Sequence, residues 1–406
     1  MSQSFADLGV SKATVRALSE RDIDVPFAVQ TGVIPDVLAG KDVLVKSPTG
    51  SGKTLAFATP LVDLVRPEGP RPAALILAPT RELASQIVDE MYKICHAKSL
   101  SVTAVYGGVG IQKQVRMAAR SHIIVATPGR LIDLLDRRAF RLDEIEFLVL
   151  DEADRMLDMG FKPVVDKIVK MTPENRQTML FSATLDGEVG RIAAAYTRSP
   201  VRHEHAPTPE RVGQIEHRFL RVLHDMKVDH LVKELREGGR GRTLVFVRTK
   251  RGADRLVKRL GHHDVKAVAM HGDKSQSQRE KALSRFESGH VDTLVATDVA
   301  ARGIDVADIT HVINFDAPGG REDYVHRIGR TARAGATGVG ITFVLDDQEQ
   351  DVAKMAGELG LHSELEAGGL RVRGASTGGR PGPGGGASKR RRPHRGQGPK
   401  QATGRR

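Results

Sequence analysis

Residues 43–54 read Val43-Leu44-Val45-Lys46-Ser47-Pro48-Thr49-Gly50-Ser51-Gly52-Lys53-Thr54. The apolar start of this stretch predicts a short buried strand, and the apolar residues from Leu55 to Leu64 predict a helix after it. A Gly-rich loop between a strand and a helix brings backbone N–H groups close to nucleotide phosphates. In such a loop Lys53 places positive charge at the β- and γ-phosphates, and the Thr54 hydroxyl binds magnesium. A chance structural loop is the alternative that this stretch alone leaves open.

Acidic residues follow a second apolar run. Asp151-Glu152-Ala153-Asp154 closes the run Phe147-Leu148-Val149-Leu150. In phosphoryl transfer one acid holds magnesium and a neighbour orients the attacking water, so we assign Asp151 to the metal and Glu152 to the water. Acidic residues also favour helix N-termini, and alone this segment would be interpreted as a solvated helix start. The phosphate loop upstream favours the catalytic interpretation.

Short apolar runs recur through both halves of the chain, with helical stretches between them. They lie at 43–45, 74–77, 123–125, 147–150 and 179–181, and again at 244–247, 267–270, 294–296, 312–315 and 341–344. Continuous apolar strands that alternate with helices predict parallel sheets covered on both faces. We therefore predict an α/β fold class with two domains, 1–205 and 214–365. Pro207 and Pro209 break any periodicity in the predicted linker, 206–213.

Cysteine content and hydropathy limit the possible classes of protein. The 406 residues contain one cysteine, Cys95, which excludes an internal disulfide and a zinc site built from cysteines. We interpret Cys95 as a half-buried helix residue. The first twenty residues lack the apolar segment of a signal peptide, and no run of eighteen apolar residues predicts a membrane span. We therefore expect a cytoplasmic protein without a membrane partner.

The net charge of +12 is concentrated at the C-terminal end of the chain. Residues 366–406 contain eleven Lys and Arg against one acid, which leaves about +2 on the other residues. Gly, Pro, Arg and Ser dominate this segment, so it cannot bury a core and we expect a disordered basic tail. It is either a solubility tail or an arm that binds nucleic acid without sequence preference, and the rest of the chain favours the arm.

Further motifs follow in order along the chain. They are Ala78-Pro79-Thr80-Arg81-Glu82-Leu83-Ala84, Gly107-Gly108, Thr127-Pro128-Gly129-Arg130, Ser182-Ala183-Thr184, Thr297-Asp298-Val299-Ala300-Ala301-Arg302-Gly303-Ile304-Asp305 and His326-Arg327-Ile328-Gly329-Arg330-Thr331-Ala332-Arg333. With the phosphate loop and Asp151 to Asp154, they make the chain resemble the DEAD-box family of RNA helicases in superfamily 2. The resemblance runs from Phe5 to Gln350 and looks like a bacterial RhlE-type member.

The resemblance implies two tandem RecA-like domains and an ATP site shared between them. Gln30 would read the adenine edge with its amide, which offers one donor group and one acceptor. Phe5 and Ile23 would pack on or near the base. The family usually has Pro-Thr-Pro-Ile-Gln where this chain has Pro26-Phe27-Ala28-Val29-Gln30. Phe27 and Ala28 are therefore departures, which change the packing but leave the Gln30 amide in place. The phosphates would be bound by Thr49, Gly50, Ser51, Gly52, Lys53 and Thr54.

The resemblance also assigns residues of the second domain. Asp305 would contact the ribose, while Arg330 and Arg333 would stabilise charge on the γ-phosphate as arginine fingers. A coupling group would connect the two sites, comprising Asp154, Ser182, Ala183, Thr184 and His326. The RNA backbone would be contacted by Pro79, Thr80, Arg81, Gly108, Thr127, Arg130, Arg248, Thr297 and Gly303, with Arg248 and His271-Gly272 the weaker candidates. Backbone contacts carry no base information, which agrees with an aromatic content of 4% and no Trp.

These observations predict an RNA-stimulated ATPase that uses ATP and Mg²⁺ to unwind or remodel RNA duplexes locally and non-processively. We expect it to bind duplex and single-stranded RNA without sequence preference, as a monomer, with ribonucleoprotein or RNA-decay partners possible. An ATP-gated RNA clamp or annealing chaperone and a DNA-directed superfamily 2 translocase are the alternatives. His203 with His205, and His262-His263, lack the Cys or carboxylate that would complete a metal site, so we do not favour one there.

Overall fold

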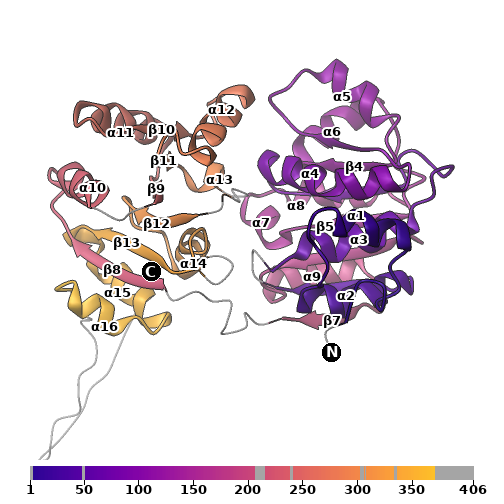
Figure 1. Cartoon of the computed structure of the whole chain (residues 1–406), viewed down its shortest axis with the longest axis horizontal. Coiled ribbons are helices and arrows are strands. Elements are labelled where there is room, and N and C mark those ends of the chain that lie inside the picture. The colour runs from indigo at the N-terminus through magenta and orange to yellow at the C-terminus, as the bar shows by residue number, and fades with distance from the viewer. Residues whose placement is uncertain are drawn as a thin grey trace, which may run out of the picture.

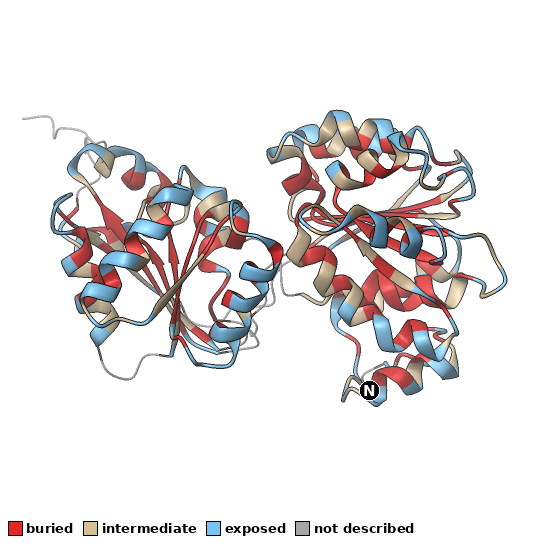
Figure 2. Cartoon of the chain, turned by 90° about the horizontal axis from the view of Figure 1, so that it is seen from above, coloured by how far each residue is buried: buried red, intermediate tan, exposed pale blue. Residues whose placement is uncertain are grey.

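The computed structural model describes residues 3–47, 51–205, 215–237, 241–301, 306, 308–332 and 336–370. Two sheets, each with helices on both faces, form two lobes beside each other (Figure 1). All strand pairs in the described part of the chain run parallel. The strands of both lobes are buried between helices whose outer faces are exposed (Figure 2). The predicted fold class, two parallel α/β domains in tandem, is therefore confirmed.

The first sheet has seven strands in the order β3-β4-β2-β5-β6-β1-β7. Its strands are β1 (Val43–Lys46), β2 (Ala74–Leu77), β3 (Val102–Val105), β4 (Ile123–Ala126), β5 (Phe147–Leu150), β6 (Gln177–Ser182) and β7 (Val201–Glu204). Its helices are α1 (Lys12–Ser19), α2 (Ala28–Leu38), α3 (Lys53–Leu64), α4 (Arg81–Ala97), α5 (Ile111–Ala118), α6 (Pro128–Asp136), α7 (Ala153–Asp158), α8 (Lys162–Val169) and α9 (Gly187–Tyr196).

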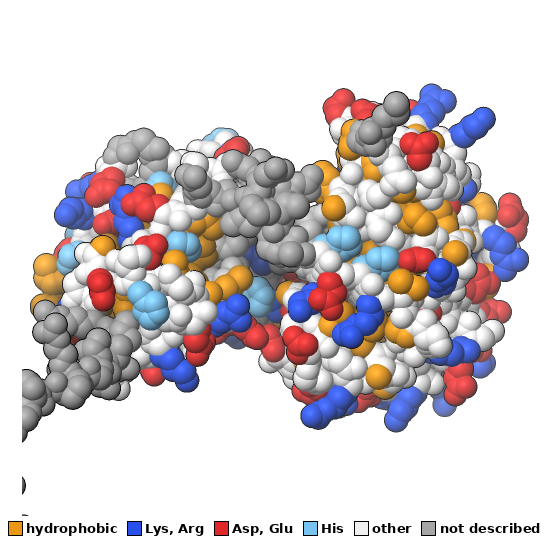
Figure 3. All heavy atoms as spheres, turned by 90° about the horizontal axis from the view of Figure 1, so that it is seen from below, with side chains coloured by type: hydrophobic (Ala, Val, Ile, Leu, Met, Phe, Trp, Pro, Cys, Tyr) orange, Lys and Arg blue, Asp and Glu red, His pale blue; other side chains and the backbone are white. Residues whose placement is uncertain are grey.

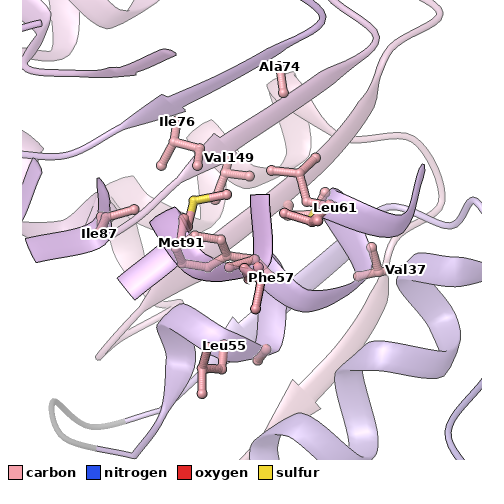
Figure 4. Packing of buried hydrophobic residues seen from close by; sticks show 14 of the residues in the cluster. Val37, Leu55, Phe57, Leu61, Ala74, Ile76, Ile87, Met91 and Val149 are labelled. Atoms are coloured by element: carbon pink, nitrogen blue, oxygen red, sulfur yellow. The ribbon is translucent and has the colours of Figure 1, made fainter. Parts of the chain in front are cut away.

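Two apolar cores hold the first domain, one on each face of its sheet. Helices α1 to α4 pack on one face, and residues of α6 to α9 pack on the other. In the first core, Phe57 of α3 and Met91 of α4 lie against Ile76 and Val149 of the sheet (Figure 4). A strand buried on both faces has no polar side to present, which is why β2, β4 and β5 read as continuous apolar runs.

The second sheet has six strands in the order β10-β11-β9-β12-β13-β8. Its strands are β8 (Ile215–Arg221), β9 (Arg242–Phe246), β10 (Ala267–Met270), β11 (Thr293–Ala296), β12 (Ile309–Asn314) and β13 (Gly338–Val344). Its helices are α10 (Lys227–Arg236), α11 (Lys250–His262), α12 (Gln276–Glu287), α13 (Asp298–Ala301), α14 (Arg321–Ile328), α15 (Glu349–Glu358) and α16 (His362–Ala367), with a 3₁₀ turn, η2, at Asp346–Gln348. Helices α10 and α11 cover one face, and α12 to α16 cover the other.

The chain departs from the sequence-based expectations at a few places. Helix α16 and the buried Leu370 extend the folded part past residue 366, because Leu365 and Leu370 join the core of the second domain. The predicted linker, 206–213, and residues 371–406 of the predicted tail lie outside the described residues. Cys95 lies in a helix as expected but is fully buried, and burial raises the pKa of its thiol to about 12. No helix of the described chain is long and apolar enough to cross a membrane.

Candidate functional site

Three loops meet at the carboxyl edge of the first sheet. The phosphate loop follows β1, the segment from Ser182 follows β6, and Asp151 follows β5. Strand β6 lies between β1 and β5, so the phosphate loop and the acidic segment follow strands that are not adjacent. The carboxyl ends of parallel strands share one edge of a sheet, where ligands of open α/β folds bind. The topology therefore brings the predicted phosphate, coupling and acidic segments together.

Lys53 is the buried cation of the phosphate loop. Its ammonium donates to the Ser47 carbonyl at 3.0 Å, and the Ser47 and Ser51 hydroxyls are 2.6 Å apart. Gly52 adopts a φ of 86°, and a Cβ there would lie 2.5 Å from the Phe27 ring and 2.7 Å from the Gln30 amide. Glycine is therefore required by both backbone conformation and space. Thr54 is half-buried in the first turn of α3, while Thr49 and Gly50 lie outside the described residues.

Asp151 is buried with 3% of its surface exposed. Burial raises the pKa of this carboxyl to about 7, although Lys53 opposes the shift, and the nearby Glu152 carboxylate adds to it. The Glu152 backbone N–H donates to Asp151 Oδ1 at 3.0 Å. Glu152 itself has φ 50° and ψ 53°, a left-handed conformation that costs a non-glycine residue free energy. Such strain is retained where the neighbouring structure fixes a side chain in one direction.

Gln30 is the buried polar residue of α2. Its Oε1 accepts from the Phe27 N–H at 2.8 Å, and its Nε2 donates to the Gly52 carbonyl at 3.0 Å. The amide therefore caps its own helix and holds the phosphate loop, and reading an adenine requires it to exchange or share these bonds. Ile23 is half-buried, whereas Phe5 lies inside the core with 1% exposure. Phe5 can support a base-binding pocket from behind but does not line an open surface.

The segment Ser182 to Thr184 connects the acidic and phosphate loops. Asp154 Oδ2 accepts from the Ala183 N–H at 3.2 Å, and the Ser47 N–H donates to the Ser182 carbonyl at 3.0 Å. The Thr184 N–H lies 3.4 Å from Ser182 Oγ. Hydrogen bonds therefore join this segment to both loops.

A crevice between the domains brings second-domain residues to the acidic loop. It is lined by Arg155 of α7 and, from the second domain, by Phe246, Asp298, Ala301, Asp323, His326, Arg327 and Arg330. His326 and Arg330 therefore share this crevice with Arg155, the residue that follows Asp154 in the sequence. Arg330 is buried with 4% exposure. Arg333, Asp305 and Gly303 lie outside the described residues.

Arg327 holds the 326–330 segment in place, a role that the sequence interpretation did not assign. Its guanidinium binds both carboxylate oxygens of Asp298, at 2.6 and 2.8 Å, and donates to the Asp316 carbonyl at 2.6 Å. It also lies 5.1 Å from the centre of the Phe246 ring. These contacts fix α14, and with it His326 and Arg330, on the sheet. The sequence offered one signal for Arg327, which is its place within the motif from His326 to Arg333.

Small residues and arginines form the predicted RNA edge of the first domain. Thr80 caps α4 by accepting from the Leu83 N–H at 3.2 Å, and Pro79 and Thr127 are likewise buried. The Arg81 guanidinium lies against Gly108, whose φ is 87°. Arg130 donates to the Val109 carbonyl at 3.1 Å and to Gln114 Oε1 at 2.9 Å. Arg130 therefore holds the loop of Gly107 and Gly108.

The second domain adds a similar edge. Arg248 and Thr249 are exposed after β9, and Thr249 caps α11 by accepting from the Gly252 N–H at 3.0 Å. Thr297, which follows β11, is buried. His271 is also buried and lies 3.0 Å from the half-exposed carboxylate of Asp254. Its contact with RNA stays a prediction.

An ion pair that the sequence did not predict joins the two domains. Arg279 Nη2 of α12 lies 2.7 Å from Glu82 Oε1 of α4, and both side chains are more than nine-tenths buried. Burial raises the pKa of Glu82, although Arg279 opposes that shift, and burial lowers the pKa of Arg279. Glu82 follows Arg81, so this contact lies beside the predicted RNA edge.

Comparison with known proteins identifies both halves of the chain. Residues 27–192 match the model of the DEAD/DEAH box helicase family, and residues 226–335 match that of the helicase conserved C-terminal domain. The DEAD-box ATP-dependent RNA helicase CshA of Bacillus licheniformis is 42% identical over 355 residues, covering 87% of this chain and 73% of the relative. CshA of Bacillus subtilis is 41% identical over 345 residues, covering 85% and 70%.

The chain belongs to the DEAD-box ATP-dependent RNA helicase family.

Solved DEAD-box structures share its two-domain architecture. Dbp5 of S. cerevisiae bound to RNA and ADP BeF3 aligns with a TM-score of 0.79 at 28% identity, covering 90% of this chain and 93% of that one. Mss116p bound to ssRNA and AMP-PNP aligns with a TM-score of 0.77 at 26% identity, covering 88% and 78%. A DEAD box protein from Methanococcus jannaschii reaches only 0.51 despite 35% identity and coverage of 91% and 98%. The Methanococcus jannaschii protein is more similar to this chain in sequence than Dbp5 is, but its structure aligns less well. We therefore infer that the two domains of this chain are placed relative to each other much as in the RNA-bound Dbp5 structure.

Proposed function

We propose that the chain hydrolyses ATP in response to RNA and uses the closure of its two domains to unwind or remodel short RNA duplexes, without processive movement. The observation that carries this proposal is the crevice in which Arg330 of the second domain meets Arg155, the neighbour of Asp154, in the first. A site divided in this way is complete only when the domains are together. Membership of the DEAD-box family supports the same reaction and substrate class.

The ATP-binding roles follow the placement of the side chains. Gln30 would exchange its bond to Gly52 for the adenine edge, and Lys53 would leave the Ser47 carbonyl for the β- and γ-phosphates. Glu152 would hold the attacking water. It directly follows Asp151, whose pKa is raised by burial, and its carboxylate is near enough to add to that rise. Arg330, with Arg333, would stabilise the charge that develops on the γ-phosphate. The ribose contact of Asp305 completes the proposed ATP site.

Magnesium fits the oxygen donors of this site. Asp151 is a buried carboxyl whose raised pKa reflects missing solvation, and a divalent cation beside it would stabilise the charged form. Thr54, in the first turn of α3, would supply a hydroxyl oxygen. Bound Mg²⁺ would neutralise phosphate charge during the reaction. We therefore propose Asp151 and Thr54 as the residues that hold it.

Domain closure would couple the ATP and RNA sites. The pair Glu82–Arg279 joins α4 to α12 beside Arg81, and the hydrogen bond of Asp154 to Ala183 connects the acidic loop to the segment between the sites. Both sites gain their second-domain groups in the same movement, so each ligand favours binding of the other. A duplex strand that must bend to follow the completed groove would separate from its partner.

The proposed RNA edge binds the backbone of duplex and single-stranded RNA without reading bases. Its members are Pro79, Thr80, Arg81, Gly108, Thr127, Arg130, Arg248, Thr297 and Gly303. We further propose a monomeric protein of the cytoplasm, of the RhlE type, with domains at 1–205 and from residue 214 and a basic tail. Ribonucleoprotein or RNA-decay partners belong to this proposal as well. The short core and the tail support the RhlE type, while the relatives compared here carry the name CshA.

A strand-displacement assay tests the proposed function. We expect a short RNA duplex to separate in the presence of ATP over multiple turnovers, with much less separation of a DNA duplex of the same sequence. A non-hydrolysable ATP analogue should support at most a single round, because RNA release needs hydrolysis. If the analogue supported as many rounds of duplex separation as ATP does, the clamp or annealing chaperone would be favoured. ATP turnover stimulated equally by DNA and RNA would favour the DNA translocase.

A further inference from the structure

Helix α11 carries a row of cations on one exposed face. Arg251, Arg255, Lys258 and Arg259 are exposed, and His262 continues the row. Their spacings of four, seven, eight and eleven residues from Arg251 place all of them on one side of a helix. We call the four Arg and Lys residues the α11 stripe. The buried residues Ala253, Leu256 and Leu260 occupy the opposite face, so the stripe points away from the sheet.

Nearby acids balance little of the charge of the α11 stripe: the pKa of Asp273 is lowered mainly by its hydrogen bond with Lys250, and Arg251 only adds to that shift. Asp254, on the flank of the helix, is already engaged by Lys274 at 2.8 Å and His271 at 3.0 Å. Lys250, at the start of the helix, pairs with Asp273 at 2.6 Å. No ion pair involves the four stripe residues within the described part of the chain. A solvated surface normally mixes both signs, as the face of the molecule in Figure 3 does.

The α11 stripe begins at the proposed RNA edge. Arg248 and Thr249 lie directly before α11, and Arg251 is in its first turn. From Arg251 to His262 the row extends about 16 Å at 1.5 Å per residue. Helices α11 and α12 also lie on the same side of the molecule as α5 and α6, which follow the RNA loops of the first domain (Figure 1). Nucleic acid that leaves the groove over Arg248 would therefore meet this row.

We propose that the α11 stripe binds phosphates of the RNA duplex that adjoins the single strand held between the domains; this rests on the proposed function. A straight row of cations on a rigid helix suits the regular phosphate spacing of a duplex. The stripe contains no aromatic residue on which unpaired bases would stack. It therefore recognises backbone and shape, as is typical of duplex RNA recognition. Its effect would be to retain the duplex next to the groove in which strands separate.

The test compares a triple variant of the stripe, R255Q/K258Q/R259Q, with a matched control, R137Q/R138Q/R141Q. The control removes the same charge from exposed arginines at and after the C-terminal end of α6. Two RNAs are used with a non-hydrolysable ATP analogue: a decamer single strand, and the same decamer joined to a duplex. Dissociation constants are measured between about 50 and 200 mM salt, the range in which phosphate contacts change affinity strongly.

For the stripe variant we expect affinity for the duplex-bearing RNA to fall about tenfold or more at 50 mM salt. The slope of log K against log salt should flatten by about 2 to 3, since each lost phosphate contact contributes about 0.9. Decamer affinity and thermal unfolding should match those of the wild type, and R255K/R259K should keep duplex affinity. An unchanged duplex slope, or an equal loss for the decamer, would overturn the inference. A wild type that bound neither RNA would instead refute the proposed function itself.

Discussion

Asp151 shows how burial sets the chemistry of a single residue. Its carboxyl lies between the Lys53 ammonium and the Glu152 carboxylate at the end of β5, with a pKa of about 7. Near neutral pH a large fraction is therefore neutral before a cation binds. In the proposed site magnesium would bind the carboxylate, so metal binding would release this proton. We expect ATP affinity in magnesium to weaken as pH falls below 7.

The raised pKa of Asp151 predicts how the free energy of unfolding of Asp151→Asn should change with pH. The pKa in the folded protein is raised above its ordinary value of 3.8, so the folded state binds the proton more tightly. The stabilisation is complete below pH 3.8 and is lost as pH rises through about 7. Asparagine does not titrate, so the variant should gain stability relative to the wild type between pH 4 and 8, by at most about 4 kcal/mol.

Urea unfolding of both proteins across this pH range measures the difference. The exposed Asp347→Asn is the control, and its difference from the wild type should stay constant. If the free energy of unfolding of Asp151→Asn did not rise relative to that of the wild type with increasing pH, the pKa of Asp151 would not be raised by burial.

At the residue scale, sequence supplied the types of group but not their present partners. Lys53, Asp151 and Glu152 could be proposed because their motifs combine chemistry with a fixed position after a strand. The hydrogen bonds of Gln30 with Phe27 and Gly52 could not be predicted, because they depend on how α2 packs against the phosphate loop. The partners of Arg327 are similarly brought together by folding, since Asp298 begins α13 and Asp316 lies in the loop after β12.

At the scale of elements, the strands that sequence missed are β3, β7 and β8. All three lie at sheet edges, where one side of the strand meets fewer neighbours. In β7 burial alternates: Val201 and His203 are half-buried while Arg202 and Glu204 are exposed. In β7 and β8, polar residues at exposed positions interrupt the continuous apolar signal. The strands inside both sheets keep that signal because helices cover both of their faces.

The contact between α4 and α12 gives a prediction for domain closure. Arg279→Met leaves Glu82 as a buried charge without its partner only when the domains are together. Losing one partner of a buried pair costs about 3 to 5 kcal/mol, so the RNA concentration for half-maximal ATPase stimulation should rise about 100-fold or more. RNA titrations of ATP turnover measure this shift.

The double variant Glu82→Leu with Arg279→Met controls for the loss of charge. It removes both buried charges, so it should recover much of the stimulation that the single variant loses. Thermal unfolding should be nearly unchanged in both variants if the pair acts between domains rather than within one. Normal RNA stimulation of Arg279→Met would show that the ion pair does not contribute to closure.

At the scale of the whole molecule, charge separates the folded domains from the C-terminal tail. Residues 366–406 account for most of the net charge, while the folded part ends with Leu365 and Leu370 in a core. Deleting residues 371–406 should therefore leave the fold intact. It should weaken RNA binding and flatten its salt dependence, because counterion release by the tail is lost.

Filter binding at several salt concentrations tests this deletion, with ATP turnover in the absence of RNA as the control. That unstimulated turnover should change little. A salt slope equal to that of the full chain would mean that the tail does not bind RNA.

RNA-stimulated ATP turnover in Glu152→Gln tests whether this chain hydrolyses ATP with Glu152 holding the attacking water. The glutamine keeps the size of the side chain but cannot hold and activate water as a carboxylate does. The exposed Glu174→Gln is the matched control. We predict that wild type and control respond to RNA, while Glu152→Gln still binds ATP and RNA but loses stimulated turnover by about 100-fold or more. Undiminished RNA-stimulated turnover in Glu152→Gln would show that Glu152 does not hold the attacking water.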